Sequence, residues 1–131
     1  MSNATHASPA ARSVDVTTMR QTVDRVLDPD SAPNVMPPAG EELDTLILTL
    51  RGQLALIVPE IETALRSLHK TDPQRYGVLA CLSETRQKLR VSVDDRATHE
   101  VAVALARRLA RSLNALCYHY ERLTAGTADR G

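Results

Sequence analysis

The side chains best suited to chemistry in this chain of 131 residues gather in one short segment near its C-terminal end. Residues 114–121 read Asn-Ala-Leu-Cys-Tyr-His-Tyr-Glu and hold two of the three Tyr, one of the two Cys and one of the four His residues. The imidazole of His119 can act as a general acid or base near neutral pH. A histidine at the edge of a helix stripe also serves as a boundary residue bonded to a neighbour, and we adopt that interpretation.

Arg107 and Arg111 extend this chemistry toward the N-terminal side of the segment. On a helix they share an outer face with Tyr118, and Asn114 also points outward, because residues three or four positions apart are neighbours. We therefore name one set of ligand-binding or partner-binding candidates and no catalytic residue. The set is Arg107, Arg111, Asn114, Tyr118 and His119.

Charge is unevenly divided along the chain, which suggests a second role for Arg107 and Arg111, namely contact with an acidic partner. Residues 1–74 hold six basic and ten acidic side chains, whereas residues 75–131 hold ten basic and six acidic ones. An acidic partner would relieve the repulsion between arginines four positions apart. That partner is another protein, a phosphate or the acidic half of the same chain, and plain solvation is the remaining alternative.

Residue spacing excludes several common sites. The five glycines are scattered, so no glycine-rich loop can cradle a phosphate. No Glu is followed three positions later by a His, as di-iron helical bundles require. Cys117 and His119 are two positions apart and point about 200° away from each other on a helix, which does not suit zinc. We expect no metal and no cofactor.

Composition narrows the function further. The 16 basic and 16 acidic residues cancel, which argues against nucleic acid or an anionic membrane as a partner. With no Phe and no Trp, the chain lacks the ring platforms on which single-stranded bases stack. It has no apolar run long enough for a membrane span and no signal-peptide pattern in its first 12 residues. We expect a cytoplasmic protein with two reduced cysteines.

Hydrophobic periodicity predicts four helices, over residues 14–27, 41–69, 73–90 and 96–123. In the second of these the apolar stripe is Leu43, Ile47, Leu50, Leu54, Ile57, Ile61, Leu65 and Leu68. In the third it is Tyr76, Leu79, Leu82 and Leu89, with Val78 beside them. In the fourth it is Val101, Leu105, Leu109, Leu113, Leu116, Tyr120 and Leu123. Asp72 is expected to cap the helix that begins at Pro73, and Gly126 to stop the last one.

These elements predict an all-α fold, an antiparallel three-helix core of two long helices and one shorter one. The N-terminal helix is an optional fourth member, joined by a linker with four prolines in residues 28–40. The expected organisation is an N-terminal helix and partly disordered linker in residues 1–40, a bundle domain in residues 41–124 and a disordered tail in residues 125–131.

The helix expected over residues 41–69 has a second usable face. Opposite its main stripe lie Leu48, Gly52, Leu56, Pro59 and Thr63. We predict a partner face at Leu48, Gly52 and Leu56, and a central position for this helix. The two long helices span about 42–45 Å and the shorter one about 27 Å, at about 1.5 Å per residue. Some of the apolar stripe must therefore be covered by the N-terminal helix or by another chain.

Several motifs are similar to those of a known family. They are Leu50-Arg51-Gly52-Gln53-Leu54, Ile57-Val58-Pro59-Glu60-Ile61-Glu62, Leu79-Ala80-Cys81 with Glu84 and Arg86, and residues 109–121. Over residues 41–123 the chain resembles an uncharacterised family of small helical proteins of high-GC actinobacteria, labelled as natural-product biosynthesis proteins. Where the family pattern has an acid, this chain has Tyr118, which argues against catalysis at that position. The resemblance implies an association with natural-product biosynthesis and assigns no site residues.

The leading interpretation is a non-enzymatic accessory or regulatory protein that acts by helix-face contacts with a protein partner or in a homodimer. The first alternative is a small ligand-binding or catalytic helical bundle that uses the C-terminal helix around a polar or anionic molecule. The second is a DNA-binding regulator that acts as a dimer.

Overall fold

The computed structural model describes residues 14–27, 40–91 and 98–130, which form four α-helices and no strand. The helices are α2 (Val16–Leu27), α3 (Gly40–Leu65), α4 (Pro73–Leu89) and α5 (His99–Arg130). The all-α fold class is confirmed. Expectations for residues 1–13, for the proline-rich linker at 28–39 and for residues 92–97 lie outside the described residues. No helix in the described parts of the chain combines the length and apolarity needed to cross a membrane.

Side-chain caps set where three of the helices begin. The carboxylate of Asp15 accepts bonds from the backbone N–H (3.0 Å) and hydroxyl (2.7 Å) of Thr18, so α2 begins two residues later than predicted. The predicted cap is confirmed at Asp72, which accepts a bond from Gln74 N (2.8 Å). The hydroxyl of Thr98 accepts a bond from Val101 N (3.2 Å), and α5 starts directly after Thr98.

Two arginines close the C-terminal ends of the neighbouring helices. Helix α3 stops at Leu65 rather than His69, and the guanidinium of Arg75 in α4 donates to the carbonyl of Leu65 (3.0 Å). In return, Arg51 in α3 donates to the carbonyls of Leu89 (3.0 Å) and Val91 at the end of α4. Because the last carbonyls of a helix have no partner within it, such donors stabilise the helix end. The predicted stop at Gly126 is wrong, since α5 continues to Arg130.

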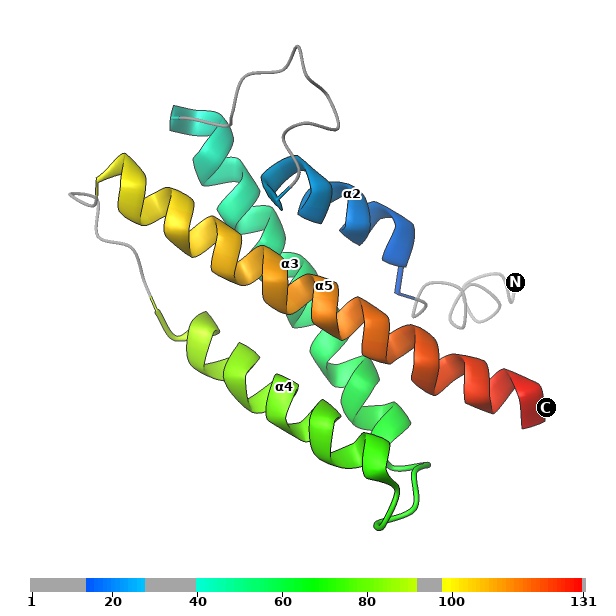
Figure 1. Ribbon diagram of the computed structural model, residues 1–131. Helices are drawn as coiled ribbons and strands as arrows, with labels where there is room; N and C mark the ends of the chain where they lie inside the picture. The colour runs from blue at the N-terminus through cyan, green and yellow to red at the C-terminus, as the bar shows by residue number, and fades with distance from the viewer. Residues whose placement is uncertain (1–13, 28–39, 92–97, 131) are drawn as a thin grey trace, which may run out of the picture.

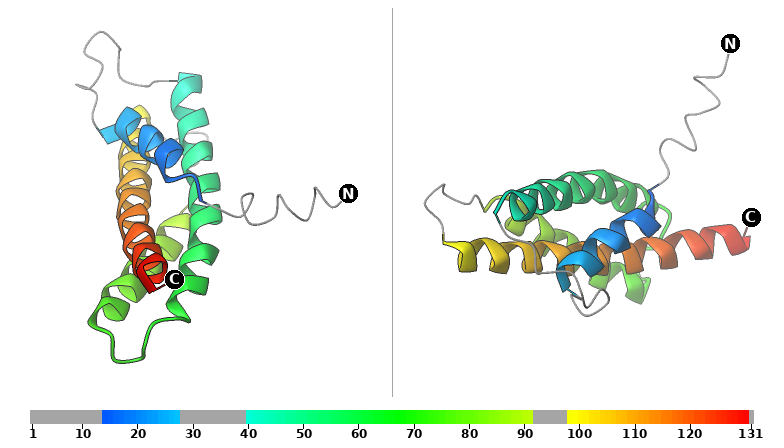
Figure 2. Two further views of the ribbon diagram at one scale, coloured as in Figure 1. Left: turned by 90° about the vertical axis from the view of Figure 1, so that its right-hand side faces the viewer. Right: turned by 90° about the horizontal axis from the view of Figure 1, so that it is seen from above.

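Successive helices run in opposite directions, and α5 lies among the other three (Figure 1). Helix α5 packs most extensively against α3 and also contacts α2 and α4. Helix α3 lies at one edge of the molecule, with the other described helices to one side of it (Figure 2). The expectation that the helix at 41–69 is central is therefore wrong, because α5 occupies that position.

The hydrophobic core is built mainly from aliphatic side chains of α3 and α5. Buried side chains in α3 are Leu43, Ile47, Leu50, Leu54, Ile57, Ile61 and Leu65, and those in α5 include Leu105, Leu109, Leu113, Leu116 and Leu123. In α4 the buried face is Val78, Leu82 and Thr85, whereas Tyr76 is 81% exposed and Leu79 is also exposed. The predicted stripe of α4 is therefore rotated from the observed one. Thr85 fits the core because its hydroxyl donates to the carbonyl of Cys81 (2.8 Å).

Helix α2 covers the part of α5 that α4 cannot reach. Met19 and Val23 are buried, and the thiol of Cys117 donates to the thioether of Met19 (3.9 Å). Ion pairs from Arg20 to Glu121 and from Arg25 to Glu42 flank this contact. The optional fourth helix is thus a member of the bundle. The chain itself covers the predicted apolar stripe of α5 except at its first residue, Val101, which is 52% exposed.

Candidate functional site

Four of the five candidate side chains form one stripe on the solvent side of α5. Arg107, Arg111, Asn114 and Tyr118 are all exposed, in steps of four, three and four residues along the helix. Residue His119 lies on a neighbouring face of α5 and meets only Tyr118 of these four. It follows Ser112 by two helical turns, and the hydroxyl of Ser112 is bonded to Lys88 Nζ of α4 (2.9 Å), so His119 faces the α4 side. The structure therefore brings four of the five residues together.

The aromatic end of the stripe is a small stacked cluster. The guanidinium of Arg122 lies 5.4 Å from the centre of the Tyr118 ring, which fits a cation–π contact. The His119 ring meets Tyr118 edge-on, with centroids 5.5 Å apart. Since Tyr118 is still 52% exposed, this cluster is a surface feature.

The surroundings of His119 favour the neutral form of its imidazole. Burial lowers the pKa of its imidazole below the ordinary value, and the nearby Arg122 lowers this pKa further. Its Nδ1 atom is buried and has no hydrogen-bond partner among the described residues. His119 was expected to be a boundary residue bonded to a neighbouring side chain. It is half-buried at the edge of the core, as expected, but its Nδ1 atom makes no such bond to a described residue. Within the described parts of the chain, no three His, Cys, Asp or Glu residues come close enough together to hold a metal ion.

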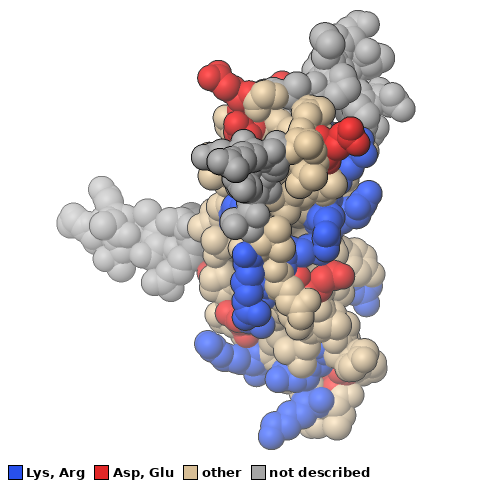
Figure 3. Space-filling view, turned by 90° about the vertical axis from the view of Figure 1, so that its left-hand side faces the viewer, with Lys and Arg blue, Asp and Glu red and all other residues tan. Residues whose placement is uncertain are grey.

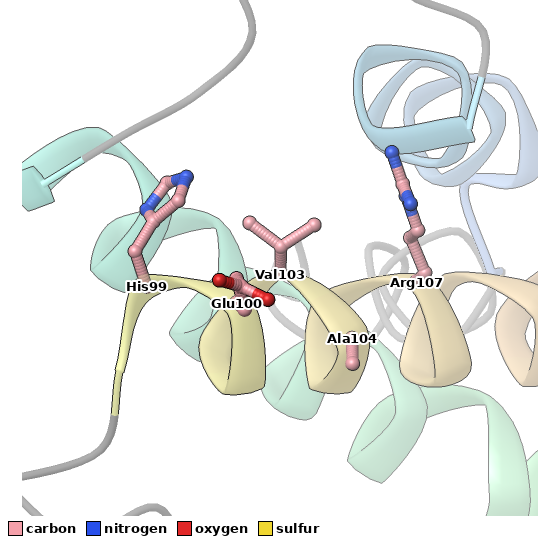
Figure 4. Close-up of a pocket in the computed structure, with 5 residues that line it drawn as sticks. All are labelled: His99, Glu100, Val103, Ala104 and Arg107. Atoms are coloured by element: carbon pink, nitrogen blue, oxygen red, sulfur yellow. The ribbon is translucent and has the colours of Figure 1, made fainter.

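A shallow pocket of about 360 Å³ lies at the opposite, N-terminal end of α5. Its described lining is His99, Glu100, Val103, Ala104 and Arg107, all from the first turns of α5. Figure 4 shows the His99, Val103 and Arg107 side chains on one side of the helix. Because the described lining comes from one helix, no second described element closes the pocket. Only Arg107 links it to the predicted candidates.

Charged side chains on this side of the molecule do not form one continuous patch. Figure 3 shows Lys and Arg scattered among uncharged and acidic side chains over the face. Part of the basic excess of the C-terminal half is matched within the chain, because Arg86 of α4 pairs with Glu62 of α3. This pair lies on α4 and does not test the predicted self-pairing of Arg107 and Arg111 on α5.

A different surface stands out on α3, where the predicted partner face is exposed. Leu48 is 69% exposed and Leu56 is 65% exposed, with Gly52 one turn from each. Between residues 45 and 63, every exposed residue of α3 is uncharged. These residues, which we call the α3 face, are Thr45, Leu48, Thr49, Gly52, Ala55, Leu56, Pro59 and Thr63.

The charged residues of this stretch of α3, Arg51, Glu60 and Glu62, lie at the edges of the α3 face, about 80–100° from Gly52 around the helix. Arg51 is bonded to the end of α4, and Glu62 is paired with Arg86, so both are only partly exposed. The solvent side of a surface helix ordinarily carries charged residues. Five residues of this face were predicted from the sequence to lie opposite the main stripe, namely Leu48, Gly52, Leu56, Pro59 and Thr63, whereas Thr45, Thr49 and Ala55 were not. Counting charges along the face in steps of about 100° would have found them.

Comparison with known proteins identifies a family and no function. No match was found among curated proteins or among solved structures. A family model described as "Family of unknown function (DUF6415)" matches residues 17–125. That span contains the packed parts of all four helices. The chain therefore belongs to this family of unknown function, DUF6415.

Proposed function

We propose that this protein is a non-enzymatic accessory or regulatory protein that binds a protein partner through the α3 face. The observation that carries the proposal is a run of exposed α3 residues without a charge, centred on Leu48, Gly52 and Leu56. Burying a fully exposed Leu side chain is worth about 1.5–3 kcal/mol, so two exposed leucines one turn either side of a glycine favour association. Exposed apolar surface of this kind marks interaction sites in soluble proteins.

The length of α4 had suggested that a second chain covers part of the apolar stripe of α5. Apart from Val101, the apolar stripe of α5 is covered within the chain, by α2 where α4 does not reach, so the stripe gives little reason for a second chain. The α3 face has no such cover among the described helices. Two further expectations belong to this proposal: an association with natural-product biosynthesis, which the resemblance of the motifs implies, and a cytoplasmic location, which the sequence pattern predicts.

The two alternative functions draw less support from the geometry. A ligand-binding or catalytic role for α5 needs a closed polar cavity, whereas Arg107, Arg111, Asn114 and Tyr118 are exposed. A dimeric DNA-binding role needs a concentrated basic surface, and the charges are mixed on the face of Figure 3. We therefore favour protein binding through α3.

The test is capture of partners by the tagged full chain in its native cells, with an untagged copy of the same chain among the candidates scored. The variant Leu48→Lys places a charge on the α3 face. The matched control is Val101→Lys, which makes the same kind of exchange at an exposed residue of α5. A partner that is held by the wild type and the control but lost by Leu48→Lys supports the proposal. Equal capture by all three chains, or no specific partner of the wild type, contradicts it.

A further inference from the structure

We infer that the occupant of the α3 face is the α3 face of a second copy of this chain, packed antiparallel about a two-fold axis at Gly52. This inference rests on the proposed function and names its partner. A two-fold interface requires a surface that is complementary to itself. In an antiparallel pair centred on Gly52, residues equally far before and after it lie at the same level.

The α3 face has this symmetry. Leu48 and Leu56 each lie four residues from Gly52, and their positions are about 40° to either side of it around the helix. Leu48 of one copy therefore lies beside Leu56 of the other, on both sides of the axis. In the same way, Thr49 of one copy lies level with Ala55 of the other, because each is three residues from Gly52. Thr45 lies level with Pro59, because each is seven residues from Gly52. All of these residues are exposed and uncharged.

The glycine at the centre is unexplained by packing within the chain. A Cβ atom built at Gly52 would meet nothing within 4 Å, so no described neighbour requires a glycine. Its φ angle is not positive either, since the only described glycine with positive φ is Gly40. A glycine inside a helix is less favourable than alanine. In the two-fold pair, Gly52 faces Gly52 of the second copy and allows the two backbones to approach closely.

Charges at the ends of α3 also fit the antiparallel arrangement. Glu41 lies in the first turn of α3, 11 residues before Gly52, and Arg66 directly follows the last residue of α3; both are exposed. In the antiparallel pair the N-terminal end of one α3 lies beside the C-terminal end of the other, which brings Glu41 of one copy toward Arg66 of the other. Neither forms an ion pair within the described part of the chain. Each dimer would contain this acid–base contact twice.

The like charges that fall level with each other are kept apart. Asp44 and Glu60 each lie eight residues from Gly52, but about 80° to opposite sides of it around the helix. In the two-fold pair they therefore occupy opposite edges of the interface. If the second α3 ran parallel to the first, Asp44 of one copy would instead lie level with Asp44 of the other, and Glu60 level with Glu60.

The small size of the α3 face limits the affinity of two copies for each other. The α3 face runs from Thr45 to Thr63 and is about 27 Å long, and a contact strip about 10 Å wide covers about 270 Å² per copy. This is about a third of the ~800 Å² per partner in a standard stable interface. We therefore expect a reversible dimer with a Kd in the micromolar range or weaker.

The decisive experiment is cysteine crosslinking of the full chain with Cys81→Ser as background, since the other thiol, Cys117, is buried. Gly52→Cys places two thiols against each other at the axis, within the range of a disulfide. Because the added side chain weakens the non-covalent pair, the oxidation is run at about 1 mM chain, where even a weak pair is populated. Thr63→Cys is the matched control, because its two copies would lie about 33 Å apart. We expect a rapid disulfide dimer for Gly52→Cys and none for Thr63→Cys. Equal crosslinking of both variants, or none of either, would overturn the inference.

Sedimentation from about 10 μM to about 1 mM provides the second measurement. The wild type should shift from monomer to dimer, and Gly52→Arg, which has open space around it, should weaken the dimer at least ~30-fold. A wild type that stays monomeric throughout would overturn the inference. If that chain still loses a captured partner on Leu48→Lys, the proposed function stands and only the self-association is wrong.

Discussion

Replacing Gly52 by alanine should have opposite effects on the folded monomer and on its association. Gly52 lies inside α3, is exposed, and would place a new Cβ atom in open space. The substitution therefore recovers the helix propensity of alanine, which is about 0.8–1.0 kcal/mol better than that of glycine. For a domain of this size the gain corresponds to a rise in Tm of roughly 4 °C.

Gly77 in α4 is a matched control for this substitution. It also lies inside a helix, is exposed and has open space where a Cβ would be placed. Gly77→Ala should raise the free energy of unfolding by the same ~1 kcal/mol. It should leave dimerisation unchanged, whereas Gly52→Ala should weaken it, because a methyl group at the two-fold axis separates the helices.

The assay measures both quantities on the same three proteins. Urea unfolding at low micromolar concentration reports the monomer, and sedimentation at high concentration reports the dimer. A Gly52→Ala chain that unfolds more easily than the wild type would refute the claim that this position is open to solvent. A chain that is stabilised and dimerises as the wild type does would refute the role of Gly52 at an axis.

Three further predictions follow from the other helices. Because the pKa of His119 is lowered from 6.5 in the folded chain, the unfolded chain takes up this proton first as the pH falls. The free energy of unfolding should therefore decline below pH 6.5, and His119→Gln should remove that part of the decline, as measured by urea unfolding at several pH values. Arg51→Met should cost about 1.5–3 kcal/mol of unfolding free energy, because it removes charge-assisted bonds to the carbonyls that end α4. An unchanged urea midpoint would contradict that capping role. Met19→Ala should weaken α2 docking by about 2–5 kcal/mol and speed maleimide labelling of Cys117, whose pKa burial raises to about 11. Labelling as slow as in the wild type would mean that α2 does not protect this thiol.

Sequence patterns were most informative where local chemistry is strong. The aliphatic stripe of α3 was predicted almost residue for residue, because a repeat of three and four positions fits only one face of a helix. Asp72 before Pro73 marked the start of α4, since both residues act on the adjacent backbone. Tyr118 and Asn114 were predicted to point outward, and they are exposed.

The same reasoning failed where a residue's surroundings come from distant parts of the chain. Tyr76 and Leu79 were predicted to be buried in α4, yet α4 turns Val78, Leu82 and Thr85 toward the core. A weakly amphipathic helix has no single preferred face, so its neighbours decide its rotation. The functional roles of the candidate residues on α5 and α3 stay predictions.

The sequence by itself determined the helical class, the positions of the helices to within a few residues and the presence of an uncharged face around Gly52. These properties depend on spacing along one helix. Only the tertiary structure decided that α5 is central, that α2 completes the core over Cys117, and that Arg51 and Arg75 close the ends of each other's helices. Those outcomes depend on contacts between residues far apart in the chain, where many pairings have similar local energies and packing of the whole bundle selects one.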